Sequence, residues 1–188
     1  WNTSTNLTWS HTCTGSDLVL VVDSLSSGGV VSGVTYNSAA MTVIDSVVGE
    51  AYSWYKIAPT SGAHNVSVSV GSSPIWGCAK SYSGVNQTTP IDSHGKAGDI
   101  TTGTTVTIST TVVSANCWVS GGCFVGSNTV ASPTVTVDKT MRQTQGYTSN
   151  YCAAGSADSN GTVSTGSYSM VFTISSGTLG GGAGVMYS

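Results

Sequence analysis

The sequence contains little charge. Lys, Arg, Asp and Glu together make up 7% of its 188 residues, against roughly a quarter of an average soluble protein. The five basic residues stand singly and the formal net charge is −3. No cluster of them is able to neutralise a run of phosphates or an anionic membrane surface. We therefore do not expect nucleic acid as a partner.

Long apolar runs are missing as well. No stretch approaches the roughly 18 consecutive apolar residues that a membrane helix requires, so we expect no membrane insertion. The sequence begins at Trp1, with neither an initiator Met nor a signal-peptide pattern. We expect it to be a processed or trimmed product.

Helix signals are nearly absent, because no window of ten residues keeps apolar side chains at helical spacing. Short β-branched or aromatic runs occur instead, separated by Gly, Ser, Asn and Pro, a pattern typical of an antiparallel sandwich. With 39% hydrophobic residues, the chain has enough apolar material for a core. We predict one all-β domain over residues 1–188, an antiparallel two-sheet β-sandwich. The expected strands are 6–11, 18–23, 41–48, 52–57, 64–70, 76–82, 105–113, 117–124, 134–137, 168–174 and 183–187.

Periodicity within these segments predicts which side chains are buried. Apolar residues alternate with Ser and Thr in two segments, so one face of each should be core and the other wet. The run Leu18-Val19-Leu20-Val21-Val22 is continuously apolar, as expected of a central strand covered on both faces. Three tryptophans lie within expected strands and are interpreted as core aromatics. The alternating residues are Val66, Val68 and Val70, then Val106, Ile108 and Thr110, and the tryptophans are Trp9, Trp54 and Trp76.

The five cysteines are an odd number, with no C-x-x-C pair and no histidine at zinc-ligand spacing. We predict no metal site and no other cofactor. Cys117 and Cys123 flank a segment containing Gly121 and Gly122, which would allow a tight hairpin and a disulfide. The alternative is that all five cysteines are small buried hydrophobic side chains.

Asn-x-Ser/Thr tripeptides supply candidate glycosylation sites. A chain this rich in Ser and Thr also produces such tripeptides by chance. The five tripeptides begin at Asn2, Asn6, Asn65, Asn86 and Asn160.

Catalytic patterns are missing from the sequence. Glu occurs once among the eight acidic residues, and no Gly-x-Ser-x-Gly elbow or activated cysteine is present. We interpret the polar cluster Asp92-Ser93-His94 as a surface loop. Asp158-Ser159-Asn160-Gly161 is interpreted as a β-turn, since a calcium loop would need a further acidic ligand downstream. We predict that the protein is not an enzyme.

Four phrases in the first half of the sequence carry a family resemblance. The first joins 7–12 to 15–22, the second joins 34–37 to 40–42, and the third joins the strand and Ala-Pro turn of 54–59 to 62–66. The fourth is Tyr82-Ser83-Gly84-Val85-Asn86-Gln87-Thr88-Thr89-Pro90-Ile91. Together they resemble a β-sandwich module that recurs in bacteriophage structural and tail proteins and in bacterial extracellular and surface proteins. The resemblance covers residues 5–92 and is generic afterwards. The cysteines and the scarce charge depart from the usual pattern.

The resemblance implies a jelly-roll-like sandwich without a catalytic motif, displayed on a virion or cell exterior. We expect a structural protein of an extracellular assembly: a phage capsid-decoration or tail-associated protein, or a surface filament subunit. Its partners would be copies of itself or other virion or surface subunits. Scarce charge fits a surface covered by neighbours, since interface cores are depleted of charged residues. The alternative is a carbohydrate-binding or adhesion module with glycan contacts at Trp118, Tyr147 and Tyr151.

Overall fold

The structure, a computed structural model, describes residues 6–16, 18–71, 73–98, 100–131, 133–147 and 151–188. None of these residues forms a helix able to cross a membrane. They form sixteen strands, which confirms the all-β prediction. The strands are β1 (Asn6–Cys13), β2 (Val19–Ser26), β3 (Val31–Tyr36), β4 (Ala39–Ala40), β5 (Thr42–Val47), β6 (Ala51–Ile57), β7 (Gly62–Val70), β8 (Ile75–Tyr82), β9 (His94–Ala97), β10 (Thr105–Val112), β11 (Ser120–Ser127), β12 (Val135–Val137), β13 (Thr140–Tyr147), β14 (Cys152–Asp158), β15 (Gly166–Ile174) and β16 (Leu179–Tyr187).

The strands pair antiparallel in four sheets rather than the two that the sequence predicted. The first half of the chain forms an outer sheet, β1-β7-β3-β4, and an inner sheet, β5-β6-β2-β8. The second half forms another inner sheet, β13-β14-β11-β16-β9, and another outer sheet, β10-β15-β12. We refer to them as the outer and inner N-terminal sheets and the inner and outer C-terminal sheets.

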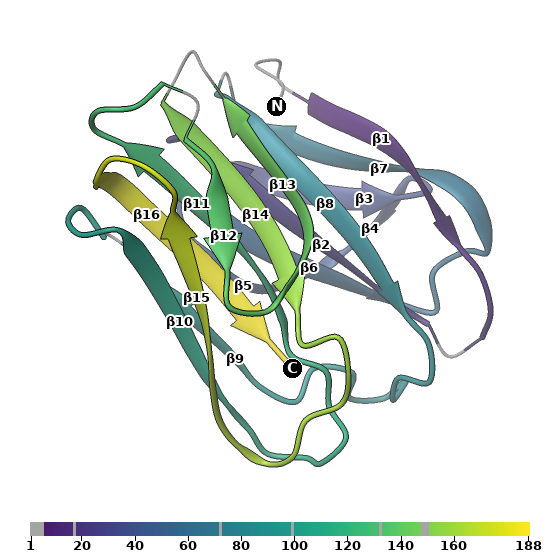
Figure 1. Ribbon diagram of the computed structural model, residues 1–188. Coiled ribbons are helices and arrows are strands. Elements are labelled where there is room, and N and C mark those ends of the chain that lie inside the picture. The colour runs from purple at the N-terminus through teal and green to yellow at the C-terminus, as the bar shows by residue number, and fades with distance from the viewer. Residues whose placement is uncertain (1–5, 17, 72, 99, 132, 148–150) are drawn as a thin grey trace.

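Three hydrophobic cores separate the sheets and define their order. One lies between the two N-terminal sheets, another between the two C-terminal sheets, and the third joins the two inner sheets. Figure 1 shows the resulting stack, from β1 and β7 on one side to β10 and β15 on the other. Each half is a two-sheet sandwich, and the two sandwiches pack face to face.

Strand β2 occupies the central position expected of its apolar run. All eight of its residues are buried, with Leu20 and Val22 in the N-terminal core and Val19 and Val21 in the core between the inner sheets. The alternating segments of β7 and β10 also bury the predicted faces. Trp76 is buried, whereas Trp9 and Trp54 are partly buried against the N-terminal core.

The number of sheets differs from the prediction because the inner C-terminal sheet is built from small residues. Strand β14 reads CAAGSAD and is buried at every position, and β11 and β16 are also rich in Gly. These strands lack the large β-branched side chains that usually mark a strand. Their flat faces let a second sandwich pack closely, so a sheet that would face solvent in a single sandwich becomes an interior layer.

The expected hairpin disulfide between Cys117 and Cys123 is not formed. Gly121 and Gly122 lie inside β11, where they pair with both neighbouring strands, so the chain continues extended between the two cysteines. All five cysteines are free, and four of them are buried. Burial raises the pKa of the Cys152 thiol to about 12 and that of Cys123 well above its ordinary value. The four buried cysteines behave as small hydrophobic side chains, which was the alternative interpretation, whereas Cys117 is only partly buried.

Candidate functional site

A cleft of about 880 Å³ opens where the two halves of the molecule meet. One wall consists of residues 83–92 of the loop between β8 and β9, which overlap the fourth sequence phrase, 82–91. The other wall is the segment 114–118 before β11, with Thr162 beside it. Tyr82, Ser120 and Tyr187 form the floor, from β8, β11 and β16. Both halves of the chain therefore contribute to one site.

The first wall is held by hydrogen bonds within its own loop. The side-chain oxygen of Asn86 accepts the backbone N–H groups of Thr88 at 2.8 Å and Thr89 at 3.0 Å, an Asx-type turn. The Gln87 amide donates to the carbonyl of Val85 at 2.9 Å and lies 3.4 Å from that of Leu18. The loop is thus tied both to itself and to the segment that leads into β2.

The second wall is fixed to the first by a carboxylate. Asp92 accepts the backbone N–H of Val113 at 2.6 Å and that of Ser114 at 3.1 Å. The weak burial of Asp92 raises its pKa, but the hydrogen bonds from Ser114 and Val113 outweigh it, and the pKa lies below its ordinary value. Farther along, Asn116 has a φ of 65° and its N–H donates to Val163.

Two aromatic rings lie side by side in the cleft. The centroid of the Trp118 ring lies 5.5 Å from that of Tyr82, and the two planes are tilted by 55°. Both side chains are only partly buried. The Tyr82 hydroxyl lies 3.1 Å from both the Ser120 hydroxyl and an Asp158 carboxylate oxygen. The ring that supports Trp118 is therefore anchored at its polar end.

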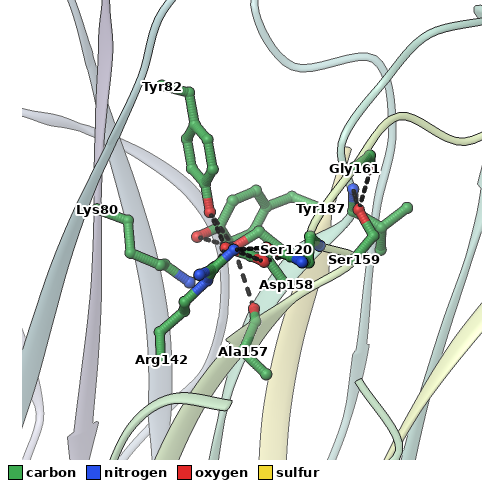
Figure 2. Close-up of polar contacts among 11 residues, drawn as sticks. Lys80, Tyr82, Ser120, Arg142, Ala157, Asp158, Ser159, Gly161 and Tyr187 are labelled. Atoms are coloured by element: carbon green, nitrogen blue, oxygen red, sulfur yellow. Dashed lines mark hydrogen bonds and ion pairs between the residues drawn. The ribbon is translucent and has the colours of Figure 1, made fainter. Parts of the chain in front are cut away.

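An arginine–carboxylate pair, with Asp158 buried and the Arg142 side chain 33% exposed, lies behind that anchor (Figure 2). Arg142 of β13 donates from Nε and Nη2 to the two oxygens of Asp158, each at 2.6 Å, and from Nη2 to Asn160 at 2.8 Å. The backbone N–H of Asn160 donates to the same carboxylate at 2.9 Å. This bidentate geometry is the strong form of a charge-assisted hydrogen bond. The contacts with Arg142 hold the Asp158 carboxylate in place, and this carboxylate accepts the hydrogen bond from the Tyr82 hydroxyl.

A second ion pair lies deeper, between the two inner sheets. The Asp23 side chain of β2 is fully buried, and Lys80 of β8 is 8% exposed, with Nζ 2.8 Å from Oδ2. Hydroxyl groups from both inner sheets donate hydrogen bonds to the Asp23 carboxylate. Ser53 donates to Oδ1 and Ser156 donates to Oδ2, each at 2.7 Å. Tyr187 lies 3.3 Å from Oδ1. A buried carboxylate needs such partners, and here the opposite sheet supplies two of them.

The floor of the cleft connects these two pairs into one network. Lys80 donates to the Ser120 hydroxyl at 2.6 Å, and Ser120 in turn lies near the hydroxyls of Tyr82 and Tyr187, at 3.1 and 3.3 Å. Figure 2 shows these side chains converging from several strands. The polar floor of the cleft is thus continuous with the hydrogen bonds that link the two inner sheets.

Burial and neighbouring charges shift the pKa values of Lys80, Tyr82 and Tyr187 in this network. Burial of Lys80 alone would lower its pKa, but the carboxylate of Asp23 and its other neighbours outweigh this, so the pKa lies well above its ordinary value. Burial raises the pKa of Tyr82 to about 12. The pKa of Tyr187 is raised well above its ordinary value, first by burial and then by Asp23. At neutral pH the lysine is charged and both tyrosines are protonated.

The three predicted glycan contacts are not brought together. Trp118 lines the cleft. Tyr147 packs against the core between the inner sheets. Tyr151 is 48% exposed, and its backbone carbonyl accepts the N–H of Ser127 at the far end of β11. Of the three, only Trp118 belongs to the site, and glycan contact there stays a prediction.

The predicted glycosylation sites lie on the surface wherever the structure describes them. Asn2 lies outside the described residues, and Asn6, Asn65, Asn86 and Asn160 are exposed. The side chains of Asn86 and Asn160 are engaged, in the Asx turn and with Arg142 respectively.

The cluster Asp92-Ser93-His94 does not form a catalytic arrangement in the structure. Asp92 faces Val113 and Ser114, whereas His94 begins β9 and its Nδ1 lies 2.9 Å from the Asp45 carboxylate. Lys96 donates to the same carboxylate at 2.8 Å. Among the residues that the structure describes, no three His, Cys, Asp or Glu side chains are grouped to hold a metal ion.

The sequence analysis missed the ionic network beneath the cleft. A usable signal was present, because Asp23 directly follows the continuously apolar run, and a charge in a strand covered on both faces requires a buried partner. Lys80 alternates in step with Trp76 and Cys78, both buried, which also places it inside. Asp158 and Arg142 had no comparable signal, since β13 and β14 were not predicted as strands.

Searches for relatives return no match. No protein-family model, no curated protein and no solved structure matches this chain.

Proposed function

We propose that the chain is a non-enzymatic structural protein of an extracellular assembly. The best candidates are a bacteriophage virion-surface protein, as capsid decoration or tail-associated protein, and a subunit of a surface filament. In this proposal, the N-terminal half is the module that the four sequence phrases resemble, and the C-terminal half is a second sandwich fused to it. Its partners would be copies of itself or neighbouring subunits.

The observation that carries this proposal is that the main paired strands of both outer faces, β10 with β15 and β1 with β7, contain no Asp, Glu, Lys or Arg. On the outer C-terminal sheet, the charged pair of Asp138 and Lys139 comes directly after β12, at the edge of the sheet. On the outer C-terminal sheet, the exposed positions of β10 are Thr105, Thr107, Ser109 and Thr111. They pair with Thr173, Val171, Ser169 and Ser167 of β15, which therefore lie on the same face. On the outer N-terminal sheet, the exposed positions of β1 are Asn6, Thr8, Ser10 and Thr12, opposite Ser69, Ser67, Asn65 and Ala63 of β7.

The few charged side chains are used elsewhere. Four of the five basic residues form ion pairs within the described part of the chain: Lys80, Lys96, Lys139 and Arg142. A free-standing domain usually keeps a mixed charged surface for solubility, whereas the interior of a subunit interface is depleted of charge. Broad neutral sheet faces therefore support contacts between subunits.

The experiment is a concentration series by light scattering, with negative-stain microscopy of the same samples. We expect regular oligomers or filaments whose proportion rises with concentration. A monomer at every concentration would contradict the proposal.

A further inference from the structure

We propose that the cleft at the junction of the two halves binds a saccharide, and that this saccharide is neutral or carries an amino group. This binding site is independent of the proposed assembly, since the cleft is formed within one chain.

The first argument is the aromatic surface. Trp118 is partly exposed in the cleft and packs against Tyr82. An aromatic face offers a broad apolar contact to the C–H face of a sugar ring, while its surroundings remain wet. The two rings form one apolar surface in a cleft that is otherwise lined by polar groups. A ligand with one apolar face and many hydroxyl groups requires this arrangement.

The second argument is the set of polar groups around these rings. Asn86 and Asn116 contribute amides, and Ser83, Thr89 and Thr162 contribute hydroxyls. Asp92 adds a carboxylate. Together they present both donors and acceptors, as a ligand rich in hydroxyl groups needs. A wholly apolar ligand would displace water from these groups without replacing its hydrogen bonds, at a cost in affinity.

The third argument is the sign of the charge. Asp92 is the carboxylate side chain among the described lining residues, and no Lys, Arg or His stands among them. Its pKa lies below its ordinary value, since the hydrogen bonds from Ser114 and Val113 outweigh its weak burial. Acidic sugars and phosphates would therefore meet a negative charge without a cation to balance it. The positive ammonium group of an amino sugar would instead be attracted to this carboxylate.

The fourth argument is that the site is preformed and of suitable size. A volume of about 880 Å³ falls in the range of roughly 300–1,000 Å³ typical of small-ligand sites. Tyr82 is anchored through Asp158 and Arg142, and Asp92 joins the two walls. A site that is already ordered loses less conformational entropy on binding.

The test starts with a glycan array carrying neutral, amino-sugar, sialylated and uronate oligosaccharides, probed with the full chain. The strongest array glycan is then titrated by calorimetry against wild type and three variants. Trp118→Ala removes the stacking surface. Asn116→Gly removes an amide and keeps the left-handed backbone. Tyr151→Asn removes an exposed ring at the far end of β11, at a φ of 52° that Asn tolerates.

We expect array binding to neutral or amino sugars, a loss of affinity of at least tenfold in Trp118→Ala, a smaller loss in Asn116→Gly and none in Tyr151→Asn. Thermal unfolding checks that each variant is folded. If Trp118→Ala does not fold, Trp118→Phe replaces it. The indole N–H signal that is missing from the NMR spectrum of Trp118→Phe identifies the Trp118 signal in the wild-type spectrum. We expect the glycan to shift that wild-type signal. No array binding, a preference for acidic glycans, or equal losses in Trp118→Ala and Tyr151→Asn would overturn the inference. An unshifted Trp118 signal would do the same.

Discussion

At the scale of single residues, the ion pair of Asp23 and Lys80 lies within the inner N-terminal sheet, and hydrogen bonds with Ser156 and Ser120 tie it to the inner C-terminal sheet. Removing a charge from water is costly, and a buried pair repays that cost only when every polar atom finds a partner. Asp23 has Lys80, Ser53, Ser156 and the nearby Tyr187 hydroxyl. The pair therefore fixes how the two sandwiches face each other more than it adds stability.

Replacing Lys80 with Met should be strongly destabilising, because Asp23 would stay buried without a counter-charge. We expect a loss of about 3–5 kcal/mol in the free energy of unfolding, measured by urea denaturation. The double variant Asp23→Asn/Lys80→Met should lose less than Lys80→Met, because the remaining amide is neutral.

Lys56→Met is the matched control for that experiment. Its Nζ lies 3.5 Å from one backbone carbonyl and takes no part in the network, so we expect a change within about 0.5 kcal/mol. Equal losses in Lys80→Met and Lys56→Met would show that the buried pair has no special role.

The raised pKa values of this network and of the Cys152 thiol predict a loss of stability at alkaline pH. The folded state raises the pKa of Tyr82 from 10.0 to about 12, that of Cys152 from 9.0 to about 12, and that of Lys80 above 10.5. The folded state therefore holds protons that the unfolded state releases, and stability falls as pH rises from about 9 to 12. Urea midpoints measured across this range should fall steadily, and Lys80→Met should flatten the upper part of the curve. A constant midpoint up to pH 11.5 would show that these groups titrate normally in the folded protein.

At the scale of elements, the close contact of the inner sheets depends on glycine in β11. A Cβ built on Gly122 would lie 2.8 Å from the Cβ of Asp23 and 2.9 Å from its Cγ. Asp23 is held by several hydrogen bonds, so it has no room to yield. Gly122 thus lets β11 approach β2 across the interface between the two halves.

Gly122→Ala should cost about 1–3 kcal/mol in the free energy of unfolding, as overpacking of an interior does. The control is Gly33→Ala in β3, where a Cβ would meet nothing within 4 Å and a small gain in stability is expected from the lost flexibility of the unfolded chain. Thermal denaturation of both variants measures the difference. If Gly122→Ala proves as stable as wild type, the two sheets are less tightly packed than the structure indicates.

The elements show why part of the fold was predictable. Strands such as β2, β7 and β10 carry branched apolar residues at regular spacing, and their existence and buried faces followed from the sequence alone. Strands β13 and β14 were missed because one is polar and the other consists of small residues, so neither shows that spacing. The site depends on these missed strands, since Arg142 and Asp158 lie on them. Of the residues that line the cleft, Trp118 was predicted as a glycan contact, whereas Asn86, Asp92 and Cys117 were named for other reasons.

At the scale of the whole molecule, one ion pair, Asp23–Lys80, is buried between the inner layers, while neutral hydroxyl and amide groups lie on the outer ones. Strands β1, β7, β10 and β15 present Ser, Thr and Asn on the outer faces. The layer order was not predictable from periodicity, which shows which face of a strand is buried but not which sheet covers it. It follows instead from the small residues of the inner C-terminal sheet.

Self-assembly through these neutral faces is the central claim, and native mass tests it most directly. Light scattering should give a multiple of the 19.0 kDa chain mass for wild type. The variant Thr107→Lys/Thr111→Lys places two charges on the outer face of β10 and should reduce the mass while leaving thermal unfolding unchanged. A wild-type mass of one chain would contradict the account. So would an assembly that stays intact both in this variant and in a variant with the matching pair Thr8→Lys/Ser10→Lys on the outer N-terminal sheet.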